Sequence, residues 1–167
     1  LPVYGGYALP YGRPLILVAE RREDVGTAVR YLLRMGYEDV RGYLRDGIGS
    51  WTMSGGRLSS FPVRSVHDVR AVQLSGTEML LVDLRDTIEL EAGIIPGSSR
   101  IHLGDLMACS SELPSDREIV LFCRSGTRGT IAASMLIGSG IKNVSVMLGG
   151  FAAWSKAGYP TERFRTV

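Results

Sequence analysis

Short apolar runs alternate with segments of helical periodicity, and no other feature of this sequence constrains its fold as strongly. The runs are LILVA (15–19), MLLVD (79–83), EIVLF (118–122) and NVSVM (143–147). Continuous apolarity is typical of strands covered on both faces, as in a parallel sheet. The segments between the runs predict helices over 24–35, 66–74, 86–92, 103–112 and 128–138. The alternation therefore predicts an α/β fold built on an open parallel sheet.

Composition narrows the functional classes. The 167 residues suit one domain, or one complete domain with an incomplete neighbour. A formal charge of +2 indicates neither a nucleic-acid nor an acidic membrane partner. No run approaches the roughly 20 apolar residues needed to cross a bilayer. Two cysteines and two separated histidines predict no disulfide framework, metal site or cofactor, and a reducing cytoplasm is the expected location.

A Ser- and Gly-rich stretch, SWTMSGGRLSS (50–60), divides the chain. Its weak periodicity is typical of a linker. We therefore predict a partial segment over residues 1–56, a linker over 57–60 and a complete domain over 61–167.

The two parts share a repeat. Residues 15–51 match 119–154 in the order strand, loop, helix, glycine turn, strand, Gly-containing turn and Trp helix. Ala19 falls opposite Cys123 at an offset of 104 residues. The same offset joins Gly36 to Gly140, Val40 to Val144 and Leu44 to Leu148, whereas Trp51 and Trp154 differ by 103. The first part thus resembles the second half of the later domain.

This first copy is incomplete. Only 14 residues precede its first strand, whereas residues 61–118 precede the second copy. Two strands cannot cover a parallel-sheet core. We expect an upstream segment to complete it, with a partner chain or the face of the second domain as alternatives.

The loop CRSGTRG (123–129) is the strongest candidate site. Cys123 directly follows a predicted strand, at the carboxyl end of the sheet, where open α/β folds place ligands. A helix starting near Thr127 or Arg128 would point free N–H groups at its sulfur, and Gly126 allows positive φ or close backbone approach. With the positive charges of Arg124 and Arg128, these features favour a thiolate. The structural alternative is a buried strand-end cysteine followed by a turn.

Other candidates have structural interpretations. His67 and His102 are expected on the surface or in helix packing, and Cys109 is expected to be a small core residue rather than a resolving thiol. Asp83 and Arg85 end a strand and could form a structural ion pair near the loop.

Three motifs resemble those of rhodanese-type sulfurtransferases over about residues 61–160. They are VDLRDTIELEAGIIPGS (82–98), IVLFCRSGTRG (119–129) and MLGGFAAWSKAGYP (147–160). The family's Asp-x-Arg pair is Asp83 and Arg85, its Glu is Glu89, and Ile94 stands where the family usually has His. The resemblance implies a rhodanese-like open sheet of five parallel strands with helices on both faces.

The resemblance also implies a chemistry. Cys123 would take sulfane sulfur from thiosulfate, glutathione persulfide or a protein persulfide and pass it to a thiol or cyanide-like acceptor. The substrate would be bound by the loop that follows, and Asp83 and Arg85 would support the site. That loop comprises Arg124, Ser125, Gly126, Thr127 and Arg128.

Two other functions stay open for this loop. Cys-x5-Arg phosphatases, and with them arsenate reductases, use a loop one residue longer than Cys123-x4-Arg128, and the shorter loop fits one sulfur atom better than three phosphate oxygens. A non-catalytic module that binds partners or senses persulfides is the other possibility.

The first copy has lost the nucleophile. Ala19 stands in place of the cysteine, and the acidic loop ERRED (20–24) would repel an anion. A degenerate rhodanese copy followed by an active one resembles the tail of metallo-β-lactamase-fold persulfide dioxygenases. The resemblance implies an upstream metallo-hydrolase domain, although none of its histidine motifs lies in this sequence.

Overall fold

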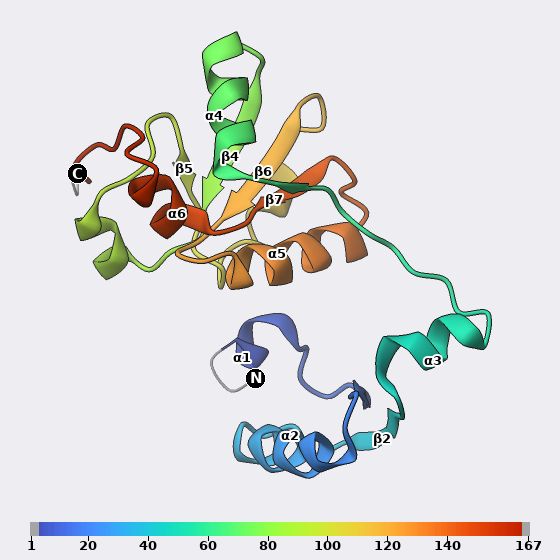
Figure 1. The fold of residues 1–167 in the computed structure, drawn as a ribbon. Coiled ribbons are helices and arrows are strands. Elements are labelled where there is room, and N and C mark those ends of the chain that lie inside the picture. The colour runs from blue at the N-terminus through green and yellow to red at the C-terminus, as the bar shows by residue number, and fades with distance from the viewer. Residues whose placement is uncertain (1–3, 165–167) are drawn as a thin grey trace. The chain divides into compact units, whose positions relative to one another are not determined.

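A computed structural model describes residues 4–164 (Figure 1). Contacts divide the chain after Ser60 into an N-terminal unit and a C-terminal unit, and each is described by itself. No helix within 4–164 is both long and apolar enough to cross a membrane.

The C-terminal unit is built on five parallel strands in the order β3-β7-β6-β4-β5. Their bounds are β3 Val63–Arg64, β4 Met79–Asp83, β5 Ser99–Arg100, β6 Glu118–Phe122 and β7 Val144–Met147. The apolar runs predicted the three longer strands, which lie together in the middle of the sheet. The two-residue strands β3 and β5 form the edges. The predicted five-stranded parallel sheet is confirmed.

Helices cover both faces of this sheet (Figure 1). Helix α5 (Thr127–Gly138) packs on β6 and β7, while α4 (Val66–Ser75) and α6 (Gly150–Lys156) contact each other on the other face. Ser65 caps α4 by accepting a hydrogen bond from Asp68 N–H at 3.1 Å, which explains why that helix begins where it does. Gly76 ends α4 in the left-handed conformation, at a φ of +73°.

Between α4, α6 and the sheet lies a continuous apolar core, the α4-side core. Its members come from both halves of the unit: Val66, Val69, Leu81 and Ile95 from the first, and Val120, Phe122, Met147, Phe151 and Trp154 from the second. All are less than a tenth exposed. Burying nine such side chains supplies much of the unit's stability, at about 1.5 to 3 kcal/mol for each large one.

Two predicted helices are wrong in type. Residues 86–92 form a 3-10 helix, η1 (Thr87–Ala92), and most of 103–112 forms turns that end in η2 (Ser110–Glu112). Asp86 and Glu89 cap the start of η1, and Glu89 is held in place by Arg128. The short helix therefore follows from side-chain contacts that its periodicity does not reveal.

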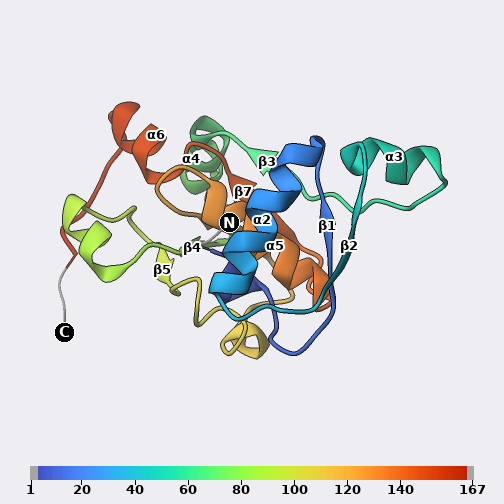
Figure 2. The same cartoon turned by 90° about the horizontal axis from the view of Figure 1, so that it is seen from below.

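The N-terminal unit contains two parallel strands, β1 (Leu15–Val18) and β2 (Val40–Leu44), which run side by side in Figure 2. Its helices are α1 (Gly5–Ala8), α2 (Arg22–Arg34) and α3 (Gly47–Met53). Their order β1-α2-β2-α3 is the order of β6-α5-β7-α6.

Backbone details recur between these two segments. Leu15 N–H donates to Asp39 O at 2.8 Å, and 104 residues later Ile119 N–H donates to Asn143 O at 2.9 Å. The turns before α3 and α6 each contain two consecutive residues with positive φ. These are Asp46 and Gly47 at +62° and +66°, and Gly149 and Gly150 at +77° and +53°.

Candidate active site

Cys123 follows the last residue of the central strand β6, at the carboxyl edge of the sheet. Its side chain is 1% exposed. Strand β6 pairs with β4 along its whole length and with β7 on its other side, so the middle of the sheet fixes the position of Cys123. The predicted location of the cysteine matches the structure.

The loop after Cys123 is held by the start of α6. The carbonyl oxygens of Cys123, Arg124 and Ser125 accept hydrogen bonds from the N–H groups of Phe151, Ala152 and Gly149, at 2.8, 3.0 and 3.0 Å. With its carbonyls turned toward α6, the loop leaves its amides free to face the sulfur. Gly126 N–H donates to Cys123 Sγ at 3.2 Å.

Two glycines make this approach possible. Gly126 has a φ of +117°, which few other residues adopt. A Cβ on Gly150 would lie 2.1 Å from the carbonyl oxygen of Cys123, so any side chain there would push α6 off the loop. The Gly-Gly pair at 149–150 is therefore part of the site, a role that the sequence motif did not reveal.

Opposing effects set the pKa of Cys123. Burial raises it, but hydrogen bonds from the backbone N–H groups of Gly129, Gly126, Ser125 and Arg128 together bring the pKa below that of an ordinary cysteine. These amides include the first turn of α5, where the helix dipole also favours a negative charge. The site therefore stabilises a thiolate, mainly through backbone groups.

Arg128 is buried, and its charge is paired. Glu89 accepts hydrogen bonds from its Nη1 and Nη2 at 2.6 and 2.7 Å, and Asp86 lies 3.3 Å from Nη1. Arg128 thus brings its positive charge close to Cys123, as expected, but shares that charge with two carboxylates. Arg128 Nε is also buried, and within residues 4–164 this N–H group has no hydrogen-bond acceptor.

Glu89 responds to this pairing. The hydrogen bond from Arg128 lowers its pKa to about 2, against the smaller opposing effect of burial. The pKa of Arg128 is raised, chiefly by Glu89 and to a lesser extent by the nearby Cys123. A carboxylate on η1 thus fixes the first turn of α5, and with it the amides around the sulfur.

Asp83 and Arg85 form a buried ion pair below the loop. Both side chains are 1% exposed, and Arg85 Nη2 donates to Asp83 at 2.6 Å. Arg85 also donates to the carbonyl oxygens of Glu89 and Gly93, and its guanidinium lies 3.9 Å from the centre of the Phe151 ring. Through these contacts the pair links β4, η1 and α6.

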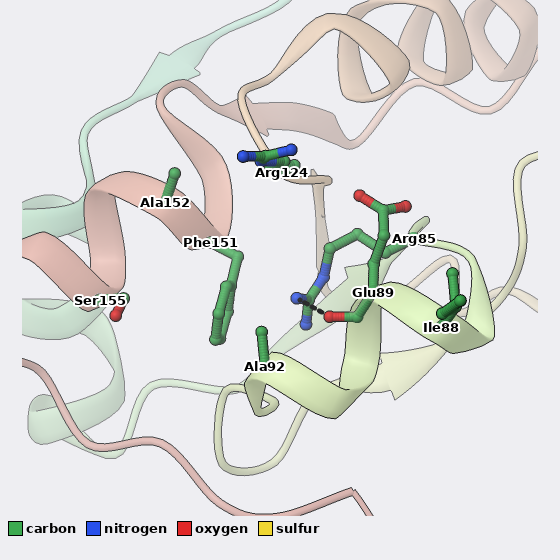
Figure 3. Close-up of a pocket in the computed structure, with 8 residues that line it drawn as sticks. All are labelled: Arg85, Ile88, Glu89, Ala92, Arg124, Phe151, Ala152 and Ser155. Carbon is green, nitrogen blue, oxygen red and sulfur yellow. Dashed lines mark hydrogen bonds between the residues drawn. The ribbon is translucent and has the colours of Figure 1, made fainter.

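A pocket of about 330 Å³ opens beside the cysteine loop (Figure 3). Arg124 approaches it from the loop, Phe151 from α6, and Ile88 and Ala92 from η1, with Arg85 and Glu89 between them. Arg124 is exposed, and Ser125 and Thr127 are exposed beside it, whereas Gly126 and Arg128 are buried. Of the five predicted substrate-binding residues, three therefore have side chains that a substrate can reach, and the two buried ones shape the loop.

The other sequence candidates lie outside this pocket. His102 pairs with Asp86 at 2.7 Å, and His67 contacts Tyr159 at the surface. Cys109 is half-buried in a turn rather than in the core of a helix. Within residues 4–164, no group of His, Cys, Asp and Glu side chains could hold a metal ion.

Comparison with known proteins agrees with this geometry. The family model of the rhodanese-like domain matches residues 66–157. A sulfurtransferase from Allochromatium vinosum is 37% identical over 89 residues, which are 53% of this chain and 83% of that protein. The thiosulfate sulfurtransferase GlpE from Pseudoalteromonas translucida is 33% identical over 84 residues, 50% of this chain and 80% of that protein.

A solved structure is similar as well. The protein RPA3614 from Rhodopseudomonas palustris, a protein of unknown function described as a possible tyrosine phosphatase, aligns with a TM-score of 0.57 at 29% identity. The alignment covers 69% of this chain and 90% of that one. The family model spans more than half of the chain and includes every element around Cys123, so this chain belongs to the rhodanese-like domain family.

Proposed function

We propose that the C-terminal unit is a sulfurtransferase in which Cys123 carries sulfane sulfur as a persulfide. One observation carries the proposal: the Cys123 thiol is buried, yet loop and helix amides lower its pKa. Such a ring of N–H groups stabilises both a thiolate and the terminal sulfur of a persulfide. The relatives named sulfurtransferases support the same activity.

The transfer takes two steps. The Cys123 thiolate attacks the sulfane sulfur of the donor, an S–S bond forms, and the donor's own S–S bond breaks. Sulfite or a thiolate leaves with the electron pair. The acceptor then attacks the terminal sulfur of the persulfide, and the Cys123 thiolate returns as the leaving group. Both leaving groups are stable anions, so the steps need neither a general base nor a cofactor.

The pocket supports an organic persulfide as the donor. Its volume of about 330 Å³ lies within the range of small-molecule sites and exceeds what thiosulfate needs. Ile88, Ala92 and Phe151 give it apolar walls, while Arg124 offers a cation for a carboxylate or sulfonate group. Glutathione persulfide meets both requirements, and thiosulfate meets the second.

Thiocyanate formation tests the activity. Purified protein supplied with cyanide and either thiosulfate or glutathione persulfide is expected to produce thiocyanate, with the higher kcat/KM for glutathione persulfide. Cys123→Ser should abolish the reaction. Cys109→Ser should leave it intact, because Cys109 lines a different pocket and the loop amides surround Cys123. No turnover with either donor would overturn the proposal.

A phosphatase is the alternative raised by the Rhodopseudomonas palustris structure. The spacing Cys123-x4-Arg128 and the engagement of Arg128 by Glu89 argue against it, because a phosphatase arginine must be free to hold phosphate oxygens. Hydrolysis of an aryl phosphate that depends on Cys123, without thiocyanate formation, would establish the alternative. A protein inactive in both assays would be a non-catalytic module.

We further infer that the N-terminal unit is a degenerate rhodanese copy without chemistry of its own. Ala19 takes the place of the cysteine, and the backbone details shared by β1-α2-β2-α3 and β6-α5-β7-α6 support a common origin. The cytoplasmic location is still a prediction from the composition, and the upstream metallo-hydrolase domain is still a prediction from the family resemblance.

A further inference from the structure

The N-terminal unit carries an apolar groove of about 520 Å³, called here the open face. Its lining residues are Ile16, Val18, Gly42, Tyr43, Leu44, Ile48 and Trp51. Large apolar side chains are left in water along it: Ile16 is 70% exposed, Val18 56%, Ile48 51% and Trp51 45%. A contiguous apolar patch of this kind usually marks an interaction surface.

The repeat identifies what the open face corresponds to. Ile16, Val18 and Tyr43 align with Val120, Phe122 and Met147 at the offset of 104, and Ile48 and Trp51 align with Phe151 and Trp154 at 103. Every one of these five partners belongs to the α4-side core, where each is at most 6% exposed. The open face is therefore the same half-core, without its cover.

In the C-terminal unit the cover comes from a single stretch of chain. The remaining members of the α4-side core are Val66 and Val69 on α4, Leu81 on β4, and Ile95. All four precede β6, and β4 also pairs with the edge of β6 along its length. Within residues 4–164, β1 pairs only with β2, so the equivalent edge of β1 has no strand beside it.

The residues just ahead of β1 do not provide the cover. Tyr11 stacks on Tyr37 with ring centres 4.4 Å apart, and its hydroxyl donates to Met35 O. The hydroxyl of Tyr37 in turn donates to Leu9 O at 2.7 Å. These contacts hold the segment at the C-terminal end of α2, and none of its residues lines the open face.

We propose that the open face binds a strand–helix segment built like residues 63–96, and that this segment precedes residue 1 in the natural polypeptide. The order of elements in the C-terminal unit carries the choice, because its cover lies ahead of β6. The offset of 104 moves Val66 to position −38 and Ile95 to position −9. The strand pairs in parallel with the free edge of β1, and aliphatic residues of the helix cover Ile16, Val18 and Trp51.

The test compares residues 1–167 with the polypeptide encoded by the complete reading frame. Acrylamide quenching of Trp51, assigned by Trp51→Phe in each protein, is expected to be strong in 1–167 and several-fold weaker in the longer polypeptide. Ile16→Asp should leave the melting temperature of 1–167 unchanged and lower that of the longer polypeptide by about 5 °C or more, because it would bury an unpaired charge. Val120→Asp, the matched core position, should destabilise both proteins.

Three outcomes would overturn the proposal. The reading frame could begin at residue 1, or acrylamide could quench Trp51 equally in the two proteins. In the third, residues 1–167 form a dimer that Ile16→Asp dissociates, and the open face then binds a second copy of the chain. Protection of Trp51 in monomeric 1–167 would show that another part of this chain covers the face. None of these readouts depends on sulfur transfer, so they stand apart from the test of the proposed function.

Discussion

Glu89→Gln tests how the loop around Cys123 is held. The wild-type carboxylate binds two nitrogens of Arg128 and also accepts a hydrogen bond from the backbone N–H of Asp86. Glutamine keeps the size and one acceptor oxygen but removes the charge. The substitution leaves a buried guanidinium with a single weak carboxylate partner, Asp86 at 3.3 Å, which lies more than half exposed.

The pKa of Glu89 gives the magnitude. It falls from 4.5 to about 2, and each pKa unit corresponds to about 1.36 kcal/mol, so the charge contributes about 3 kcal/mol to the free energy of unfolding. Because the folded pKa is the lower one, this contribution is present above pH 4.5 and is lost as the pH falls from 4.5 to about 2. Since glutamine retains part of the hydrogen bonding, we expect a loss of about 2 to 3 kcal/mol at neutral pH.

Urea unfolding in a Trp51→Phe background measures this loss in the C-terminal unit, since Trp154 then reports alone and is fully buried there. Wild type should lose stability between pH 4.5 and 2 more steeply than Glu89→Gln. Glu91→Gln, an exposed position on the same short helix, is the matched control and should change stability by less than about 0.5 kcal/mol. A Glu89→Gln value within that same limit, with an unchanged pH slope, would refute the structural role of the pair.

Three further predictions concern the loop itself. In a Cys109→Ala protein, alkylation of Cys123 by iodoacetamide should reach its plateau rate at a lower pH than that of free cysteine; a midpoint at or above that of free cysteine would contradict the lowered pKa. Gly150→Ala should cost more than about 3 kcal/mol in urea unfolding, because of its clash with the loop. Gly158→Ala, which has a φ of +71° and open space around it, should cost about 1 kcal/mol, and equal losses would exclude the close approach. Arg124→Ala should lower kcat/KM for anionic donors about tenfold while Cys123 still accepts one sulfur; an unchanged kcat/KM would place the donor elsewhere.

The architecture of the C-terminal unit follows from its sequence because the central strands are buried on both faces. Such strands must be apolar throughout, so MLLVD and EIVLF reveal β4 and β6 directly. The edge strands β3 and β5 are two residues long, and three of their four residues are exposed, which leaves no apolar run to detect. Residues 103–112 have helical spacing, yet the chain there makes only single turns around the buried Leu103 and Leu106.

The site divides in the same way. Local sequence predicts a thiolate loop, since the cysteine, the glycine and the helix start all lie within five residues. The partner of Arg128 is 39 residues away, and spacing alone does not show that two charges so far apart will pair. The hydrogen bonds by which residues 149–152 hold the loop join backbone atoms only. The sequence therefore shows them only indirectly, because position 150 must be glycine.

Intact mass spectrometry tests the central proposal most directly. The protein is treated with thiosulfate or glutathione persulfide, freed of excess donor and weighed without reductant, alongside Cys123→Ser and Cys109→Ser. The wild-type protein and Cys109→Ser are each expected to gain the mass of one sulfur atom and to lose it again when cyanide is added. Cys123→Ser is expected to gain no mass. A wild-type protein whose mass stays unchanged with both donors, or a Cys123→Ser protein that still gains sulfur, would contradict a persulfide carried on Cys123.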